Sequence, residues 1–321
     1  CVSDTNGTLR PYPIPQVSFS VQDTCLNKQH NFQNNSTIAQ GSLSYQWAFG
    51  DGTQSTRPSP AKVYPRAGSY SPQLKATSNR GCQDSLTQGL TVFEKPTARY
   101  SFTNKCQPAP IPFQDQSATA AGNSITTYNW DFGDGSGSTS ANPSNAYSSF
   151  GDYNVALTVT NNRGCKDTVQ QQVTSYAKPT ADFSAPVVCR PEATPFTDQS
   201  TVARGSLQDW SWDFESGSGS STQQNPSYTF PEGGTYDPQL IVTTDQNCED
   251  TVTRSVTVNP RPAPGFTVND TCLNDPTTFK DTSDIKSGTI TSREWQLGNG
   301  TAVNNNQRFT YTYGKPQAYQ P

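Results

Sequence analysis

The chain has 321 residues, which is enough for two or three domains of ordinary size or for a larger number of small β domains. It has 22 Lys and Arg against 26 Asp and Glu, a formal net charge of −4, and it lacks a basic patch, which argues against a nucleic-acid partner. It also lacks a run of about 18 apolar residues, so the sequence predicts no membrane span. Its 25 prolines and 23 glycines separate short aromatic and β-branched runs, and this pattern predicts an all-β protein.

One motif occurs four times along the chain, anchored by a tryptophan each time. The anchors are Trp47, Trp130, Trp212 and Trp295, which recur at a nearly constant spacing of roughly 80 residues. Before each tryptophan come an aromatic residue, a cysteine and an F-x-(N/D)-x-S motif; after the first three comes a G-x-Y motif that ends at Tyr70, Tyr153 and Tyr236. We expect these tryptophans and tyrosines to lie in the cores of successive domains.

Most segments alternate apolar and polar residues with period two, and none sustains a helical period. About seven short strands fit into each copy, which predicts a tandem array of immunoglobulin-like seven-stranded β-sandwiches. The expected domains are residues 16–94, 95–177, 178–260 and 261–321.

The run W-D-F-G-D-G, with F-x-D-x-S before it and G-x-Y-x-V-x-L-x-V after it, resembles the PKD (polycystic kidney disease) domain. The second copy, around Trp130, has the full motif, whereas the third has WDFESG and the fourth WQLGNG. The cysteine-bearing form looks like the tandem copies in large surface adhesins of gliding and other Bacteroidetes-type bacteria. The resemblance covers essentially the whole chain and implies a non-catalytic extracellular role.

Both ends of the sequence fall out of register with a whole domain. Cys1 precedes Cys25 by the same interval that separates each late cysteine from the next early one, so we expect residues 1–15 to be the last strand of a preceding domain and a linker. The fourth domain, residues 261–321, is expected to stop in its sixth strand. Two alternatives stay open: an acylated lipoprotein cysteine at Cys1, and a strand donated to another subunit in a polymerising filament.

The cysteines predict disulfides and an oxidising compartment, because C-x2-C spacing is absent and His30 is the only histidine. The early cysteine of a copy is expected where the chain leaves the sandwich and the late cysteine at the opposite end, roughly 25 Å away for strands of about 8 residues. A disulfide requires Cα atoms within about 7 Å. Inter-domain pairing, Cys25–Cys165 and Cys106–Cys248, is therefore favoured, with Cys1, Cys82, Cys189 and Cys272 free or bonded to material elsewhere. The alternative is intradomain pairing, Cys25–Cys82, Cys106–Cys165 and Cys189–Cys248.

Catalytic chemistry finds little support in the sequence. One histidine removes most acid–base schemes that work near neutral pH, and no catalytic residue is predicted. Asp51 and Asp134 correspond to Ser216 and Asn299 in the other copies, a replacement that a tight turn tolerates and a reactive site does not.

No cofactor or metal is predicted, although calcium is an option at three aspartates that could supply oxygen ligands, Asp115, Asp198 and Asp281. Local hydrogen bonding by these side chains is the alternative. Ser85, Thr168 and Thr251 follow an aspartate and precede an apolar residue, which resembles the O-glycosylation acceptor of Bacteroidetes; a repeat consensus is the alternative.

The expected function is therefore structural: a stalk or filament segment of a large repetitive bacterial surface adhesin, linked to gliding motility. The alternatives are accessory substrate-binding modules of a secreted hydrolase, which predict a flat face of exposed aromatics, and a filament subunit polymerising by strand exchange. The expected partners are neighbouring repeats, surface-attachment machinery and an extracellular ligand bound elsewhere in the protein. The expected location is the bacterial cell surface.

Overall fold

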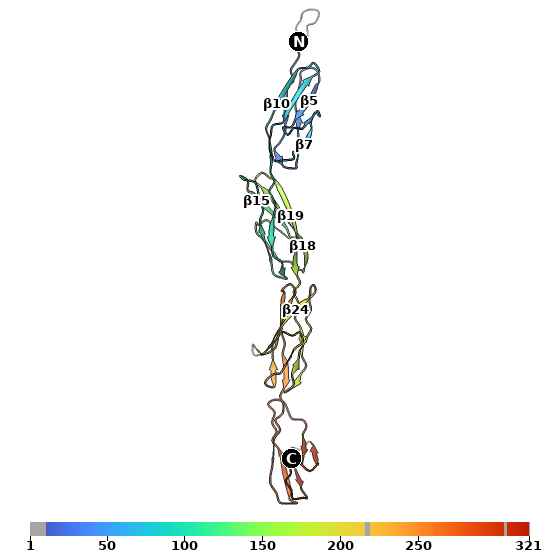
Figure 1. The fold of residues 1–321 in the computed structure, drawn as a ribbon, viewed down its shortest axis with the longest axis vertical. Helices are drawn as coiled ribbons and strands as arrows, with labels where there is room; N and C mark the ends of the chain where they lie inside the picture. The colour runs from blue at the N-terminus through green and yellow to red at the C-terminus, as the bar shows by residue number, and fades with distance from the viewer. Residues whose placement is uncertain (1–10, 216–218, 305–306, 321) are drawn as a thin grey trace, which may run out of the picture. The chain divides into compact units, whose positions relative to one another are not determined.

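A computed structural model describes residues 11–215, 219–304 and 307–320. These residues form β-strands and no helix, which confirms the predicted all-β class (Figure 1). None of them belongs to a helix that could cross a membrane. The chain divides into two compact units, Cys1–Ser175 and Tyr176–Pro321, so each unit is treated separately below. Cys1, and with it most of the strand predicted for residues 1–15, lies outside the described residues.

The first unit contains repeat 1 (residues 16–94), a sandwich of short and mostly antiparallel strands. Its strands are β1 (Phe19–Ser20), β2 (Thr24–Cys25), β3 (Gln29–Asn31), β4 (Gln33–Asn34), β5 (Leu43–Ala48), β6 (Gln54–Ser55), β7 (Ala61–Val63), β8 (Gly68–Tyr70), β9 (Gln73–Ser78), β10 (Gln83–Thr87) and β11 (Leu90–Phe93). One sheet has the order β10-β9-β5-β6, and the order β2-β11-β8 is found on the other side. The tryptophan strand β5 therefore lies inside its sheet, where a large aromatic can be buried.

Repeat 2 (residues 95–177) has the same topology with longer, less interrupted strands. Its strands are β12 (Tyr100–Phe102), β13 (Lys105–Cys106), β14 (Ile111–Asp115), β15 (Ile125–Asp131), β16 (Gly137–Ser138), β17 (Ser144–Asn145), β18 (Gly151–Asn161) and β19 (Lys166–Tyr176). The sheets have the orders β13-β19-β18-β15-β16 and β12-β14-β17. Here β18 replaces the pair β8 and β9, and β19 replaces β10 and β11.

The second unit begins with repeat 3 (residues 178–260), which has the interrupted strands of repeat 1. Its strands are β20 (Phe183–Ser184), β21 (Val188–Cys189), β22 (Thr194–Pro195), β23 (Thr197–Asp198), β24 (Leu207–Asp213), β25 (Ser220–Ser221), β26 (Ser227–Tyr228), β27 (Gly234–Tyr236), β28 (Gln239–Thr244), β29 (Glu249–Thr253) and β30 (Val256–Asn259). The larger sheet has the order β25-β24-β28-β29, and β21-β30-β27 repeats the order β2-β11-β8.

Repeat 4 (residues 261–321) contains a smaller set of strands. They are β31 (Phe266–Val268), β32 (Pro276–Asp281), β33 (Glu294–Gln296), β34 (Ala302–Asn304) and β35 (Arg308–Thr312). Among the described residues, the tryptophan strand β33 pairs only with β34. Phe266 is consequently 43% exposed, whereas its counterparts Phe19, Tyr100 and Phe183 are 6%, 4% and 1% exposed.

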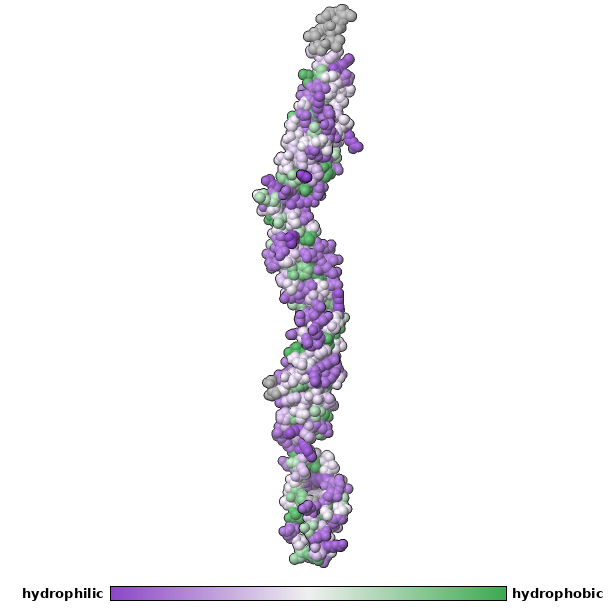
Figure 2. Space-filling model, viewed as in Figure 1, coloured by the Kyte–Doolittle hydropathy of each residue, from purple (hydrophilic) through white to green (hydrophobic). Residues whose placement is uncertain are grey.

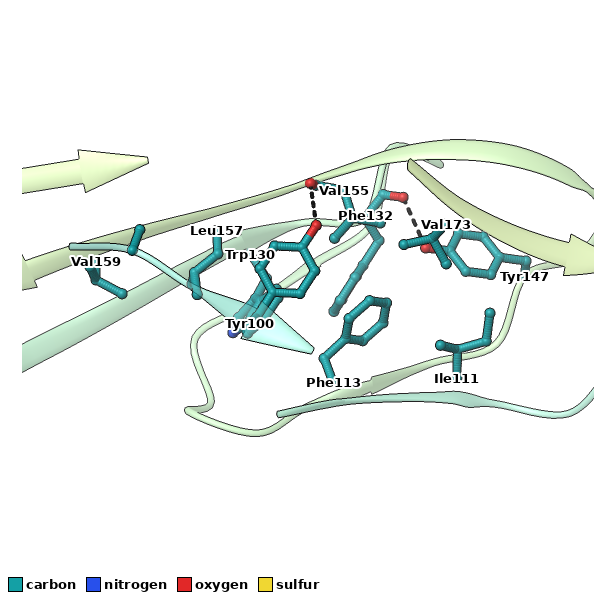
Figure 3. Packing of buried hydrophobic residues seen from close by; sticks show 11 residues of the cluster. Tyr100, Ile111, Phe113, Trp130, Phe132, Tyr147, Val155, Leu157, Val159 and Val173 are labelled. Atoms are coloured by element: carbon teal, nitrogen blue, oxygen red, sulfur yellow. Dashed lines mark hydrogen bonds between the residues drawn. The ribbon is translucent and has the colours of Figure 1, made fainter. Parts of the chain in front are cut away.

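Each anchor tryptophan is the centre of an aromatic core. Trp47, Trp130, Trp212 and Trp295 are 0%, 2%, 1% and 9% exposed. In repeat 2, the Trp130 ring lies 5.0 Å from Tyr100, 5.4 Å from Phe113 and 6.2 Å from Phe132 between centroids (Figure 3). Aromatic pairs at these separations add to the free energy of burial, so the four large rings stabilise the small sandwich.

The G-x-Y tyrosines are half-buried at the edge of each core, and their hydroxyls bond to backbone four residues upstream. Tyr70, Tyr153 and Tyr236 donate to the carbonyls of Arg66, Ser149 and Glu232 at 2.9, 2.8 and 2.7 Å. This is the geometry of the tyrosine corner of immunoglobulin-like sandwiches. Tyr319 makes the same bond to Lys315 at 3.1 Å.

His30 is a buried polar exception in repeat 1. It is 2% exposed, neither ring nitrogen has a hydrogen-bond partner, and its ring meets Tyr64 edge-on at 5.2 Å. Burial lowers the pKa of His30. The polar backbone groups of Lys28 and Lys62 and the negative charge of Asp23 act to raise this pKa, but the effect of burial is larger. The same position in repeat 2 holds Ile111, which is fully buried.

We therefore expect His30→Ile to stabilise repeat 1 by about 1–2 kcal/mol, since an unpaired buried polar group is removed. The parent should lose stability as the pH falls below about 6.5, because there the unfolded state binds a proton that the folded state does not. The variant should not show this loss. Hydrogen exchange of peptides covering residues 29–31 at pH 7.5 and 5.5, corrected for intrinsic rates, measures both effects. Peptides covering residues 111–115 serve as the control, and an equal decline in the variant would contradict the assignment.

Candidate functional site: the junction between repeats

The W-D-F-G-D-G loop of repeat 2 is a hydrogen-bonded turn. The Asp134 carboxylate accepts bonds from the Ser136 amide at 2.9 Å and from the Asn145 side chain at 2.8 Å. Although burial opposes ionisation, these bonds from Ser136 and Asn145 hold the pKa of Asp134 below its usual value. In repeat 1, Asp51 makes the same turn with Thr53 and pairs with Lys62 at 2.8 Å. The aspartates are thus engaged in the turn itself. Ser216, their counterpart in repeat 3, lies outside the described residues.

The F-x-(N/D)-x-S motif also folds onto itself. In all four repeats the side chain at its third position accepts a bond from the serine amide two residues later, at 2.9–3.0 Å. The acceptors are Asn34, Asp115, Asp198 and Asp281. The second oxygen of Asp198 accepts bonds from Trp210 at 2.7 Å and from Gln224 at 3.0 Å. Within the described residues, no three His, Cys, Asp or Glu side chains come together as a metal site.

Two glycines of the loop allow a matched test of its tight packing. Gly133 and Gly135 have φ values of +76° and +87°, but only a Cβ on Gly133 would meet backbone, lying 2.8 Å from the Asn154 oxygen. We expect Gly135→Ala to cost about 1 kcal/mol for its left-handed conformation. Gly133→Ala should cost about 1–3 kcal/mol more, because its Cβ would overlap the Asn154 backbone. Urea unfolding of repeat 2, followed by hydrogen exchange of residues 125–131, measures both; equal costs would show that the loop is not tightly packed against Asn154.

The early cysteine of repeat 1 lies at the end of the sandwich where the chain leaves the repeat. Strand β2 runs parallel to the last strand β11, with Thr24 opposite Val92 and Cys25 opposite Phe93. The Leu26 amide extends this pairing through a bond of 2.8 Å to the Phe93 carbonyl. Cys25 is therefore placed beside the start of the linker to repeat 2.

The late cysteine of repeat 2 lies in the turn between β18 and β19. The Asn161 side chain shapes this turn by accepting bonds from the amides of Arg163 and Cys165, both at 3.0 Å. Gly164 occupies the left-handed conformation that the turn requires, with φ +76°. Cys165 is completely buried.

A disulfide joins these two positions. The Cys25 and Cys165 sulfurs are 2.01 Å apart and the Cα atoms 5.6 Å apart, across a sequence separation of 140 residues. The bond therefore ties repeat 1 to repeat 2, as the geometric argument from the sequence favoured. Because Cys165 is used in this way and Cys82 and Cys189 are free thiols, the three intradomain pairs Cys25–Cys82, Cys106–Cys165 and Cys189–Cys248 are not formed.

Cys106 and Cys248 are each part of a disulfide, and Cys272 is a free thiol. Cys106 occupies the same position in its repeat as Cys25, and Cys248 the same position as Cys165. The pairing Cys106–Cys248 stays a prediction from the repeat spacing.

The linker between repeats 1 and 2 is held by further contacts that the sequence analysis missed. The Asn161 side-chain NH2 group donates to the Glu94 carbonyl at 3.2 Å, and the Arg163 guanidinium lies 5.3 Å from the centre of the Phe93 ring. At the other end of the linker, Asp167 accepts a bond from the Ala98 amide at 2.9 Å. The linker is therefore fixed to the β18–β19 hairpin on both sides of the buried Pro96.

The same clamp begins repeat 3. Asp250 accepts a bond from the Ala181 amide at 2.9 Å and pairs with Lys178 at 2.7 Å. The recurrence of aspartate at positions 84, 167 and 250 was the available sequence signal. The sequence motif by itself suggests only a glycan acceptor at these positions. The adjoining hydroxyl residues Ser85, Thr168 and Thr251 are exposed, so their modification stays a prediction.

Exposed hydrophobic side chains are scattered over the described surface (Figure 2). The large ones are Ile14, Val63, Leu86, Phe150, Val187, Phe266, Val268 and Leu273. The two aromatics among them, Phe150 and Phe266, belong to different repeats. The described residues therefore do not form the flat aromatic face that a substrate-binding module predicts.

Comparison with protein families gives a match over almost the whole chain. A PKD domain model matches residues 12–93, 94–175 and 176–260, and a second PKD domain model matches residues 265–320. PKD domains are non-catalytic modules.

Curated relatives share parts of this array. The pre-pro-metalloprotease PrtV of Vibrio cholerae is 33% identical over 176 residues, which is 53% of this chain and 18% of that protein. The collagenase ColA of Bacillus cereus is 38% identical over 69 residues, 22% of this chain and 7% of that protein. The chain thus spans less than a fifth of the length of either relative.

A solved structure of the PKD1 domain of the Vibrio cholerae metalloprotease PrtV is 36% identical and covers 25% of this chain and 96% of that domain, with a TM-score of 0.23. Since the family models together account for residues 12–260 and 265–320, the chain belongs to the PKD domain family.

Proposed function

We propose that this chain is a set of accessory, non-catalytic PKD modules of a secreted bacterial hydrolase, and that it holds another part of that protein at a fixed distance and orientation. The Cys25–Cys165 disulfide carries this proposal, because it joins two successive domains rather than stabilising one of them. The relatives support the hydrolase context, since they are named as a metalloprotease and a collagenase.

The mechanism is mechanical. A linker that is short, proline-bearing and bonded at Glu94 and Ala98 has little freedom to bend. The disulfide adds a covalent second connection between the same two repeats. If Cys106 pairs with Cys248 as predicted, repeats 2 and 3 are joined in the same way, and stiffness extends along the array.

We propose an extracellular location for the array. Structural disulfides form and persist in oxidising compartments, and the structure contains one between separate domains. Exposed hydroxyls at Ser85, Thr168 and Thr251 are available to glycosylating enzymes in such a compartment.

A second candidate is a stalk segment of a surface adhesin linked to gliding motility, in which attachment machinery and the ligand contact other regions. Four tandem repeats with an inter-repeat staple favour it, because a stalk needs length and resistance to bending. A protease or glycosidase domain encoded in the same reading frame supports the hydrolase. Many more PKD copies followed by a secretion domain support the adhesin.

Both candidates require a stiff junction, which can be measured directly. Spin labels carried by non-canonical amino acids at Gln54 and Asn129, both exposed, report the distance between repeats 1 and 2. Double electron–electron resonance should give a narrow distance distribution for the parent and one at least about twice as wide for Cys25→Ser. Cys82→Ser, which removes a free thiol, is the control. An equally narrow distribution in Cys25→Ser would show that the disulfide does not set the stiffness.

A further inference from the structure

The turn before β10 in repeat 1 reproduces the turn that carries the bonded cysteine in repeat 2. The Cys82 amide donates to the Ser78 hydroxyl at 3.1 Å, as the Cys165 amide donates to Asn161 at 3.0 Å. Repeat 3 has the same arrangement between Cys248 and Thr244, at 3.0 Å. The three turns thus share one hydrogen bond to the cysteine amide, and two of the three cysteines, Cys165 and Cys248, are disulfide-bonded.

The surroundings of Cys82 are also those of a junction. The Arg80 guanidinium lies 5.1 Å from the centre of the Tyr12 ring, which matches the 5.3 Å between Arg163 and Phe93. The Tyr12 carbonyl is 4.0 Å from the Cys82 sulfur. Tyr12 therefore occupies, at the N-terminal end of repeat 1, the place that Phe93 occupies at the N-terminal end of repeat 2.

One difference separates the two junctions. Cys165 and Cys248 are fully buried, whereas Cys82 is a half-buried free thiol. Phe93 is paired with the strand that bears Cys25, and this pairing brings the partner sulfur to Cys165. The turn, the arginine and the aromatic ring around Cys82 thus match those around Cys165.

We propose that the Ser78–Cys82 turn and Tyr12 form a docking site for a further PKD repeat, which presents the cysteine-bearing strand next to its own last strand and becomes bonded to Cys82. The proposal rests on the proposed function, since it assigns the same staple to one more junction. Formation of the bond consumes two thiols and one disulfide oxidant, a protein or glutathione disulfide. The two electrons and two protons pass to that oxidant, which leaves as two thiols.

The test supplies the proposed partner repeat within one chain. Residues 94–175, carrying Cys165→Ser, are placed directly before Tyr12 of the full chain, so that Tyr12 takes the position of Tyr176 after the added repeat. The protein is equilibrated with reduced and oxidised glutathione, alkylated and digested without reduction. A peptide linking Cys82 to Cys106 is expected, and it should be absent from the parent chain. Exposed Cys189 should be alkylated in both proteins and serves as the control.

Arg80→Ala in the extended chain separates docking from simple proximity of two tethered thiols. Loss of the stacking on the aromatic ring should shift the glutathione ratio at half-formation by about two- to five-fold. If Cys82 stays a free thiol in the extended chain while Cys25–Cys165 is intact, the proposed docking site is wrong, and the proposed function as a stiff spacer is unaffected. An unchanged ratio in Arg80→Ala would equally overturn it, because the bond would then form without the docking contact.

Discussion

Stretched from its two ends, the chain carrying Cys106→Ser and Cys248→Ser is expected to reach a contour length roughly 460–500 Å shorter with Cys25–Cys165 intact than after reduction. The disulfide removes 140 residues from the path that transmits force, and an extended chain spans about 3.3–3.6 Å per residue. Force passes from Cys25 directly to Cys165, so most of repeats 1 and 2 cannot be drawn out even when they unfold. The two serine substitutions isolate this one disulfide.

Single-molecule force spectroscopy measures the contour length before and after addition of a reductant. Cys82→Ser in the same background is the control and should leave both lengths unchanged, because Cys82 is a free thiol. The idea is falsified if the oxidised and reduced molecules reach the same length.

The parent chain tests the predicted second staple. With Cys106 bonded to Cys248, the shortest covalent path from Cys165 to Cys248 runs back along the chain to Cys106 and across the second disulfide, instead of forward along the backbone. The oxidised parent should therefore be shorter than the oxidised double-serine chain by about 80 Å, since the backward route is shorter by roughly 24 residues. Overlapping disulfides of this kind limit how far an array can be drawn out when its repeats unfold, which suits a spacer that must keep its length under tension.

The sequence was sufficient to predict the pairing of Cys25 with Cys165 because strand order and strand length alone decide which cysteines lie close together. A cysteine at the outgoing end of one sandwich and another at the incoming end of the next are close neighbours, whereas two at opposite ends of one sandwich are not. The same register predicted the buried tryptophans, since a residue that recurs at a nearly constant spacing on a period-two strand marks a core.

The contacts that fix the linker could not be predicted in this way. Asn161 donates to the backbone of Glu94, 67 residues away, and Asp167 accepts a bond from the backbone of Ala98, 69 residues away. Nothing in a local motif specifies such distant partners. The short parallel pairing of β2 with β11 was missed for a related reason, since two residues leave no periodic pattern.

Repeat 3 departs from the loop motif at one position, and the sequence alone does not show how this change alters the contacts of the loop. Glu215 stands where repeats 1 and 2 have Gly50 and Gly133, both with positive φ. One Glu215 oxygen accepts a bond from Tyr228 at 3.2 Å, and the other is buried without a partner. The substitution thus exchanges a glycine turn of positive φ for a partly buried carboxylate with one unpaired oxygen, at a cost that depends on side-chain packing rather than on sequence pattern.

Removal of the anchor ring in repeat 2 is expected to have the second large effect. Trp130→Ala should lower the free energy of unfolding of repeat 2 by about 3–5 kcal/mol, the range for deleting a large aromatic from a core. Trp130 packs against Tyr100, Phe113 and Phe132, and its indole donates a bond to the Ser140 carbonyl at 2.9 Å. Asn129→Ala on the exposed side of the same strand is the control, with an expected change below about 0.5 kcal/mol. Hydrogen exchange of residues 151–161 under increasing urea measures both variants.

The two large predictions are separable, because they concern different properties of the same repeat. In the chain carrying Cys106→Ser and Cys248→Ser, Trp130 lies within the loop that Cys25–Cys165 closes, so it contributes to stability but not to the covalent path of the force. Trp130→Ala should therefore unfold repeat 2 more easily while leaving the oxidised contour length unchanged. Cys25→Ser in the double-serine background should do the opposite, releasing the whole enclosed loop into the stretched chain while Trp130 stays buried in the folded state. A longer oxidised chain in Trp130→Ala would show that the staple depends on the core and that repeat stability, not the disulfide, limits extension.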